Sequence, residues 1–332
     1  MENHELPFTV KDVAAAQKRI HPYVRQTPLL ASGQTCAENQ PVYLKCENLQ
    51  VTGAFKARGA FNFVLSLLDQ GGAPGVITAS SGNHGQAVAY AAARMGLPCT
   101  VVVPEDVIAV KAQAIRSYGA KVEYAGHTST DRIERAEQLA TQQGWVFVPP
   151  YDHPWTAAGQ GTAGLEILQQ RPDVSVVLVP IGGGGLISGV ATAIKETRPE
   201  VRVIGVEPEL ANDTYLSLQA GRVVDIGANH TLADGLRTSH PGDYTFPIVQ
   251  RYVDEVVLVS EQDIENAARE LLFRSKLLVE PSGAVTVAAL RQLDVQRAGT
   301  GSVVCLLSGG NADPNWLATL LGNPVVGQGA LQ

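Results

Sequence analysis

The sequence predicts an α/β protein made of two doubly wound, three-layer domains, with the smaller domain inserted in the larger. Short β-branched runs alternate with alanine-rich helical stretches from about residue 75, and the pattern restarts near residue 174. Strand–helix alternation at this spacing is typical of right-handed crossovers and of a parallel sheet covered on both faces. The length of 332 residues also favours about two domains.

The smaller unit is expected to contain strands and helices in strict alternation. Its strands are predicted at Val76–Thr78, Thr100–Val103, Lys121–Tyr124 and Trp145–Val148. Its helices are predicted at Gln86–Met95, Val110–Tyr118 and Asp131–Gln143. The last helix has alanine, leucine and isoleucine on one face, and Gly144 follows it as an expected C-terminal cap.

The larger unit combines the second half of the chain with its beginning. Strands are predicted at Val42–Lys45, Val174–Val179, Arg202–Val206, Val256–Val259 and Ser302–Leu307. Prolines at 149, 150 and 154 interrupt regular structure where the two patterns meet. Residues 1–52 and 153–332 are therefore expected to form the large domain, and residues 53–152 the small domain.

Composition and charge exclude several classes of protein. A net charge of −7 and a pI near 5.5 leave no basic surface for nucleic acid. The uncharged stretch Val174–Ile194 is long enough to cross a membrane, but Pro180 and Gly182–Gly185 would break a helix there. Met1–Glu5 lacks the basic and apolar blocks of a secretory signal, so a cytoplasmic protein is expected. The four scattered cysteines show no spacing of a zinc site or a disulfide framework.

Lys56 lies in the run Thr52–Ala60, between glycines and among small and apolar residues. A tight, partly buried turn would disfavour the charged ammonium and lower its pKa, and this change makes a lysine nucleophilic. The simpler alternative is a solvated lysine at the start of a helix. The other loops of the chain decide between the two.

Loops of small residues follow predicted strands and supply complementary groups. Thr78–Gly85 combines hydroxyls, an amide and a helix N-terminus, which suits a small anion such as a carboxylate. The glycines of Ile181–Leu186 let backbone N–H groups converge on a phosphate, whereas the match to a dinucleotide-binding fingerprint is only partial. Ser308 follows another strand and offers a neutral hydroxyl to a ring nitrogen. Together with the Lys56 amine, these groups describe a site for pyridoxal phosphate.

The chain resembles the serine/threonine dehydratases and serine racemases of the fold-type II, tryptophan synthase β-like, pyridoxal-phosphate enzymes. The resemblance runs nearly end to end. It rests on the lysine segment, on the glycine loop and on the segments Lys45–Gln50, Ala158–Thr162 and Glu280–Ala284. Ala54 departs from the family, which commonly has serine at that position.

The resemblance implies a role for each residue of the site. Lys56 would hold the cofactor as a Schiff base and Phe55 would pack beside its ring. Asn83 would bind the ring's 3-hydroxyl oxygen, and Ser308 would face the ring nitrogen. The phosphate would be held by Gly182, Gly183, Gly184 and Gly185. The substrate carboxylate would be bound by Ser80, Ser81, Gly82, Asn83 and His84.

The expected activity is dehydration of L-serine or L-threonine to a 2-oxo acid and ammonia, with Lys56 as the base. Alternatives are racemisation of serine or another amino acid, with Ser81 as a second catalytic residue, and dehydration of another β-hydroxy amino acid such as 3-hydroxyaspartate. A non-catalytic ligand-binding homologue is a remote alternative, because it would not need the amine.

The resemblance to the racemase-like members adds a cation. Glu207, the Ala211 carbonyl and Asp213 would supply oxygen ligands to Mg²⁺ or Ca²⁺. A homodimer is also expected.

Overall fold

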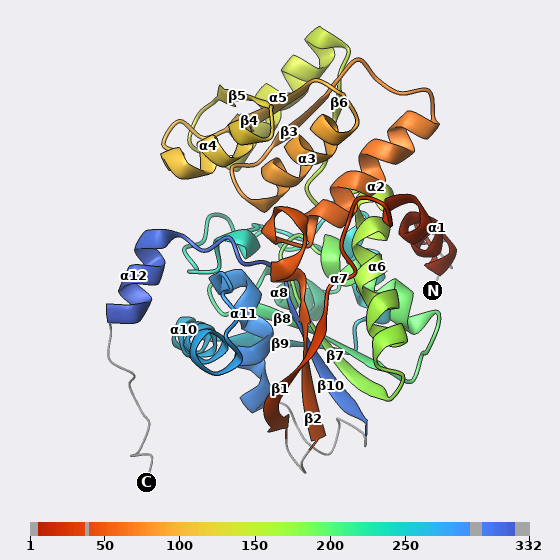
Figure 1. Ribbon diagram of the computed structural model, residues 1–332, viewed down its shortest axis with the longest axis vertical. Helices are drawn as coiled ribbons and strands as arrows, with labels where there is room; N and C mark the ends of the chain where they lie inside the picture. The colour runs from red at the N-terminus through yellow and green to blue at the C-terminus, as the bar shows by residue number, and fades with distance from the viewer. Residues whose placement is uncertain (1–5, 37–39, 293–300, 323–332) are drawn as a thin grey trace.

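The computed structural model of the chain describes residues 6–36, 40–292 and 301–322. It contains one largely parallel and one fully parallel β-sheet, each enclosed by helices (Figure 1). The predicted α/β fold with doubly covered sheets is confirmed. The small sheet and its helices lie at the top of Figure 1 and the large sheet lies below, with helix α2 (Lys56–Asp69) between them.

The large sheet has six strands in the order β1-β2-β10-β7-β8-β9. Only β1 is antiparallel to its neighbour. The strands are β1 (Leu29–Cys36), β2 (Gln40–Cys46), β7 (Val174–Pro180), β8 (Arg202–Pro208), β9 (Glu255–Val259) and β10 (Ser302–Leu307). Strand β2 contains the predicted Val42–Lys45 strand, whereas β1 is a strand that the sequence analysis did not predict. Because β10 lies between β2 and β7 and runs parallel to both, the loops that follow these three strands lie side by side at the carboxyl ends of the strands.

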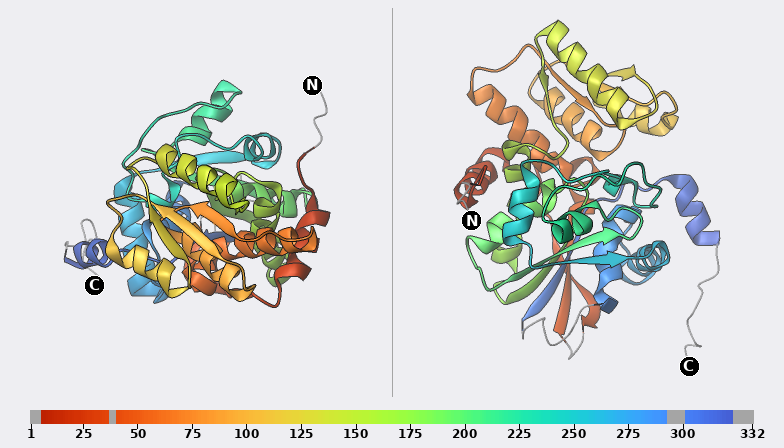
Figure 2. Two further views of the ribbon diagram at one scale, coloured as in Figure 1. Left: turned by 90° about the horizontal axis from the view of Figure 1, so that it is seen from above. Right: turned by 180° about the vertical axis from the view of Figure 1, so that it is seen from behind.

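Helices cover both faces of the large sheet because its strands are apolar on both sides. In β7, Val176 and Leu178 pack with α10 (Glu261–Glu270) and α11 (Pro281–Ala288), whereas Val177 and Val179 pack with α6 (Pro154–Gln170) and α7 (Gly185–Lys195). Figure 2 shows these layers from two further directions. The helices of this unit are α1 (Val10–Ile20), α6 (Pro154–Gln170), α7 (Gly185–Lys195), α8 (Asp213–Ala220), α9 (Thr245–Tyr252), α10 (Glu261–Glu270), α11 (Pro281–Ala288) and α12 (Pro314–Gly322).

The small sheet has four parallel strands in the order β5-β4-β3-β6. They are β3 (Val76–Ala79), β4 (Cys99–Val103), β5 (Lys121–Tyr124) and β6 (Val146–Phe147). On one face, Val76 and Val101 pack with α2, α3 (Asn83–Arg94) and α4 (Ala109–Ser117). On the other face, Ile77 and Val102 pack with α5 (Ser129–Gln143).

Local signals in the sequence explain several element ends. Gly144 ends α5 in a left-handed conformation with φ +64°, as expected for a C-terminal cap. The uncharged stretch after residue 173 forms β7, a glycine turn and α7, and among the described residues no helix is both long and apolar enough to cross a bilayer. Cys46, Cys99 and Cys305 are buried. The domain limits at residues 52/53 and 152/153 stay a prediction.

One boundary differs from expectation. Helix α3 begins at Asn83, three residues before the predicted Gln86. Asn83 and His84 therefore lie in the first helical turn, and Gly82 is the N-terminal cap position. The reason is that the small residues after β3 form a turn of only a few residues before the helix begins.

Candidate active site

Lys56 is the first residue of α2 and lies beside the end of β10. The backbone N–H of Phe55 donates to the Ser308 carbonyl oxygen at 3.0 Å, and Ala54 forms an isolated bridge with Gly309. The preceding turn contains Thr52 in a left-handed conformation with φ 61°. These contacts hold the lysine segment against the large sheet although α2 rises toward the small one.

The Lys56 amine has a carbonyl partner and an aromatic neighbour. Its Nζ donates to the Pro150 carbonyl oxygen at 2.6 Å and lies 5.2 Å from the centroid of the Phe55 ring. Burial lowers the pKa of Lys56 from 10.5 to about 8. A desolvated lysine of this kind keeps a substantial neutral fraction near neutral pH and can attack a carbonyl group.

The glycine loop lies between β7 and the N-terminus of α7. Gly184 has φ +91°, which strongly favours glycine, and a Cβ there would lie 2.7 Å from Thr245 Oγ1. A Cβ at Gly183 would lie 2.4 Å from the Tyr151 ring, and one at Gly185 would lie 2.9 Å from Tyr151 Cα. Because Tyr151 follows Pro150, the glycine loop and the Lys56 amine are neighbours. The N-terminus of α7 attracts anions here through its dipole and free N–H groups.

A second segment supports the glycine loop from outside. Thr245 Oγ1 donates to the Gly183 carbonyl oxygen at 2.8 Å. The Asp152 carboxylate accepts from the backbone N–H groups of Asp243 and Tyr244 at 2.9 and 2.8 Å, which fixes the start of α9. Sequence reasoning did not identify Tyr151, Asp152 or Thr245, because they are remote from the loop in the chain and carry no motif.

Ser308 lies at the end of β10 and is 3% exposed. Its hydroxyl donates to the Ser282 carbonyl oxygen at 3.1 Å, and it would have to rotate away from this partner to donate to an unprotonated ring nitrogen. The serine brings no formal charge to this position, and its contact with a ring nitrogen stays a prediction.

Asn83 is held from both sides of its amide group. Its Nδ2 donates to Glu280 Oε1 at 2.6 Å, and its Oδ1 accepts from Asn311 Nδ2 at 2.8 Å. Asn311 Nδ2 also donates to the Thr52 carbonyl oxygen at 2.8 Å, which connects Asn83 to the lysine segment. Burial raises the pKa of Glu280 to about 7. The sequence placed Glu280 within a family motif but gave it no role.

The Ser80–His84 segment forms the turn from β3 into α3. The backbone N–H of Gly82 donates to Ser80 Oγ at 3.3 Å, and Ser81 is half-buried. His84 is buried, and its Nε2 lies 3.0 Å from the Val148 carbonyl oxygen. Burial lowers the pKa of His84 to about 3. A neutral ring with its proton on Nε2 therefore satisfies this contact.

Comparison with known proteins shows the family to which the chain belongs. The family model described as pyridoxal-phosphate dependent enzyme matches residues 20–309. The chain belongs to this family. It is 48% identical over 325 residues to an L-threonine ammonia-lyase of Geobacter sulfurreducens. The aligned region covers 98% of this chain and 80% of that protein. It is 41% identical over 314 residues to an L-threo-3-hydroxyaspartate ammonia-lyase of Saccharomyces cerevisiae, with coverage of 94% and 96%.

Similarity to a solved structure extends this result to the fold. The structure of maize serine racemase superposes with a TM-score of 0.89 at 35% sequence identity, covering 95% of this chain and 97% of that one. The resemblance to fold-type II serine/threonine dehydratases and racemases is thereby confirmed, and so is pyridoxal phosphate as the cofactor of the family.

The residues of this pyridoxal-phosphate enzyme fit the group on structural grounds. Lys56 supplies an amine that has a backbone carbonyl partner, and Gly184 begins a helix whose N-terminus suits a phosphate. Ser308 offers an uncharged hydroxyl at the end of the neighbouring strand. The Lys56 amine, the turn at Gly184 and Ser308 all lie near the carboxyl ends of strands of the large sheet, where open α/β sheets bind ligands.

The predicted cation ligands lie at the end of β8, in the turn that follows it and at the start of α8. Glu207 accepts from the backbone N–H groups of Thr214 and Tyr215 at 3.0 and 2.8 Å, and Asp213 and Ala211 are buried. Burial and the neighbouring Asp213 raise the pKa of Glu207 to about 8, and burial raises the pKa of Asp213 to about 7. No group of three or more His, Cys, Asp and Glu side chains suited to a metal occurs in the described part of the chain. A cation here would therefore also need a backbone oxygen.

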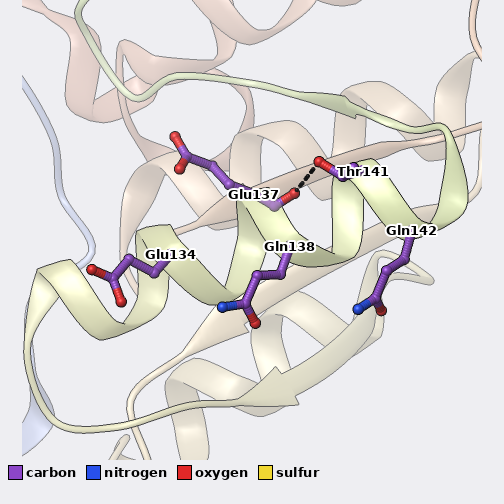
Figure 3. A pocket seen from close by; sticks show the side chains of 5 residues that line it. All are labelled: Glu134, Glu137, Gln138, Thr141 and Gln142. Atoms are coloured by element: carbon purple, nitrogen blue, oxygen red, sulfur yellow. Dashed lines mark hydrogen bonds between the residues drawn. The ribbon is translucent and has the colours of Figure 1, made fainter.

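An open hollow on the surface of α5 contains none of these groups. Figure 3 shows its lining side chains along one helix face, namely Glu134, Glu137, Gln138, Thr141 and Gln142. The opposite face of α5 packs on the small sheet through Ala136 and Leu139. The hollow includes no predicted site residue. The candidate active site is therefore not this hollow but the group of residues at the strand ends described above.

Proposed function

We propose that this enzyme is an ammonia-lyase that converts L-threonine or L-serine to a 2-oxo acid and ammonia. The observation that carries the proposal is the desolvated Lys56 amine beside a glycine loop that suits a phosphate. The similarity to an L-threonine ammonia-lyase over 98% of the chain supports the reaction class.

The proposed chemistry assigns one task to each side chain. The bound cofactor supplies a carbonyl group for the amino acid and an acceptor for the negative charge that develops at Cα. Lys56 Nζ removes the Cα proton as a general base, which its lowered pKa favours. Phe55 packs beside the cofactor ring and Gly182–Gly185 bind the phosphate. Ser308 meets the ring nitrogen without fixing a positive charge there, and this favours loss of the β-hydroxyl.

The Ser80–His84 segment is proposed to bind the substrate carboxylate. The turn presents serine hydroxyls and the N-terminus of α3, and both attract an anion. Asn83, held by Glu280 and Asn311, is proposed to bind the 3-hydroxyl oxygen of the cofactor.

Two other activities are kept as alternatives. Ser81 would deliver a proton to the face of Cα opposite Lys56, and this would give racemisation; the likeness to maize serine racemase favours this alternative. A 3-hydroxyaspartate substrate is favoured by the similarity to the yeast relative. Measuring 2-oxo acid release and serine chirality across a panel of β-hydroxy amino acids separates the three activities.

A divalent cation is proposed to bind Glu207, the Ala211 carbonyl and Asp213. Two buried carboxyl groups with raised pKa values make an oxygen-rich position that Mg²⁺ or Ca²⁺ would stabilise. Either ion at about 100 times its Kd should stabilise the protein by about 2.7 kcal/mol. Thermal unfolding with and without chelator checks this in the wild type and in Asp213→Asn, where stabilisation should disappear.

A cytoplasmic location, a homodimer and the domain limits at residues 52/53 and 152/153 complete the proposal. Size-exclusion chromatography with light scattering tests the dimer, and limited proteolysis tests the domain limits.

The decisive experiment replaces Lys56. Lys56→Ala should abolish both the visible absorbance of the bound cofactor and the release of 2-oxo acid. Lys56→Arg is the matched control, because it keeps a long cationic side chain but lacks the reactive amine, and it should be equally inactive. Turnover that survives in either variant would refute the assignment.

A further inference from the structure

Arg58 lies at the centre of a buried ion cluster, formed by Lys45, Glu47, Arg58 and Glu166 and called here the Arg58 cluster. The guanidinium contacts Glu47 through Nε and Nη2, both at 2.8 Å. It contacts Glu166 through Nη1 at 2.6 Å and Nη2 at 2.8 Å. Lys45 Nζ donates to Glu166 Oε2 at 2.6 Å. Two cations therefore balance two carboxylates.

Stability alone does not explain this arrangement. The side chains of Arg58, Glu47 and Lys45 are 0% exposed and that of Glu166 is 7% exposed. Removing charges from water costs free energy that their attraction often does not recover, and apolar residues frequently serve a protein core as well or better. An arginine between two carboxylates, however, permits essentially one orientation, because its planar fork matches both of them. The cluster therefore fixes geometry.

The geometry that it fixes belongs to the first turn of α2. Glu47 follows β2 and Glu166 belongs to α6, so Arg58 ties α2 to two other elements. The backbone N–H of Gly59 donates to Gln160 Oε1 at 3.0 Å, which adds a second tie to α6. The N-terminus of α2 has no side-chain cap, and the segment before it contains the left-handed Thr52. The start of α2 is thus held by the backbone bond from Phe55 to Ser308 before the helix and by the Arg58 and Gly59 contacts within it.

Lys56 and Arg58 project from nearly opposite sides of this turn. Residues two apart in an α-helix are about 200° apart around its axis. Arg58 faces β2 and α6, whereas Lys56 reaches Pro150. A rotation of the first turn that loosens Arg58 therefore also moves the Lys56 amine.

We propose that Arg58 is a positioning residue for Lys56, and that the Arg58 cluster holds the first turn of α2 so that the amine stays desolvated beside Pro150. The inference rests on the proposed function, in which Lys56 binds the cofactor. Arg58 acts through Lys56 and contacts neither cofactor nor substrate in this role.

The test reads the Lys56 amine directly in the cofactor-free protein. Pyridoxal phosphate is added across a pH series, the product is reduced with borohydride, and labelled Lys56 is counted by peptide mass spectrometry. In the wild type, half-maximal labelling is expected near pH 8. In Arg58→Lys, which keeps the charge but loses the fork, the half-point should rise by about one pH unit as water reaches the amine. With bound cofactor, kcat should fall about 100-fold with little change in KM.

Lys45→Met is the matched control, because it removes the other cation of the same cluster while Arg58 keeps both carboxylates. Both variants should unfold at a lower temperature than the wild type. Only Arg58→Lys should change the pH at which labelling of Lys56 is half-maximal. An unchanged half-point in Arg58→Lys, or equal shifts in both variants, would overturn the inference. Absence of labelling at Lys56 in the wild type would instead overturn the proposed function, and the inference with it.

Glu47→Gln gives an independent variant if Arg58→Lys does not fold. It keeps the shape of the side chain and removes one of the two charges that orient Arg58. A half-point shifted in the same direction supports the positioning role, and a wild-type half-point contradicts it.

Discussion

Asn83 Nδ2 donates to Glu280 Oε1 across 2.6 Å, and this bond joins the first turn of α3 to the N-terminal end of α11. One partner therefore belongs to the layers of the small sheet and the other to the layers of the large sheet. Glu280 is 5% exposed, and its own backbone N–H donates to the Gly309 carbonyl oxygen at 3.1 Å. Through its carboxylate and its backbone N–H, Glu280 thus connects Asn83 to the turn that follows Ser308.

Replacement of Glu280 should weaken cofactor binding. Glu280→Ala removes the acceptor of Asn83 and frees its amide to rotate, and a hydrogen bond to a charged group contributes roughly 1.5–3 kcal/mol. Pyridoxal phosphate should therefore bind the cofactor-free variant at least about ten-fold more weakly in a spectroscopic titration. Asp234→Asn is the control, because this nearby carboxylate pairs with Lys111. Equal weakening in both variants would show that local charge, and not the Asn83 contact, matters.

The stability of the cofactor-free enzyme should depend on pH through Lys56. Its pKa is about 8 in the folded chain, below the ordinary value of 10.5. Between these values the unfolded chain binds more protons, so the free energy of unfolding should rise as pH increases from 8 to 10.5. Urea unfolding across that range measures the slope. Lys56→Met should reduce it, and an unchanged slope would contradict the lowered pKa.

Ser81→Ala should separate the two proposed reactions. The variant keeps the Lys56 amine, so elimination from L-serine should persist within about ten-fold of the wild type, since a uniform binding contact is all that is lost. Formation of D-serine requires a proton on the other face of Cα and should disappear. Chiral chromatography after incubation with L-serine measures both. Persistent D-serine formation would exclude Ser81 as the second proton-transfer group.

Gly184→Ala should lower the free energy of unfolding by more than the cost of its left-handed conformation alone. The conformation itself costs about 1–2 kcal/mol for an L-residue. Gly221→Ala measures that part, because Gly221 has φ +66° and open space around its Cβ position, whereas a Cβ at Gly184 would lie 2.7 Å from Thr245 Oγ1. Urea unfolding and phosphate-dependent cofactor binding should both be worse for Gly184→Ala. Equal effects would show that the Thr245 contact relaxes without cost.

The sequence was sufficient to predict elements whose signals are local. The β-branched runs at Lys121–Tyr124 and Ser302–Leu307 appear as strands with the expected bounds. Lys56, the glycine loop and Ser308 were identifiable because each combines a short motif with a strand end, and the order of strands brings those ends together. Their catalytic and binding roles stay predictions.

Groups that act across the fold were beyond sequence reasoning. Glu280 meets Asn83 over 197 positions of the chain, and Glu166 meets Arg58 over 108. A single sequence contains no periodicity that pairs such residues. The predicted start of α3 is three residues too late for a related reason. Glycine and serine indicate a turn, but they do not show at which residue the turn ends and the helix begins.

The buried His84 ring has a consequence for the range of conditions in which the enzyme works. Burial keeps the pKa of His84 near 3, so the ring stays uncharged from mildly acidic to alkaline solution. A carboxylate bound at the Ser80–His84 segment is therefore met by hydroxyls and peptide dipoles, whose strength does not vary with proton concentration. Carboxylate binding by the hydroxyls and peptide dipoles of this turn should therefore change little on acidification, which would act instead on the Lys56 amine and on the Glu280 carboxyl group that holds Asn83.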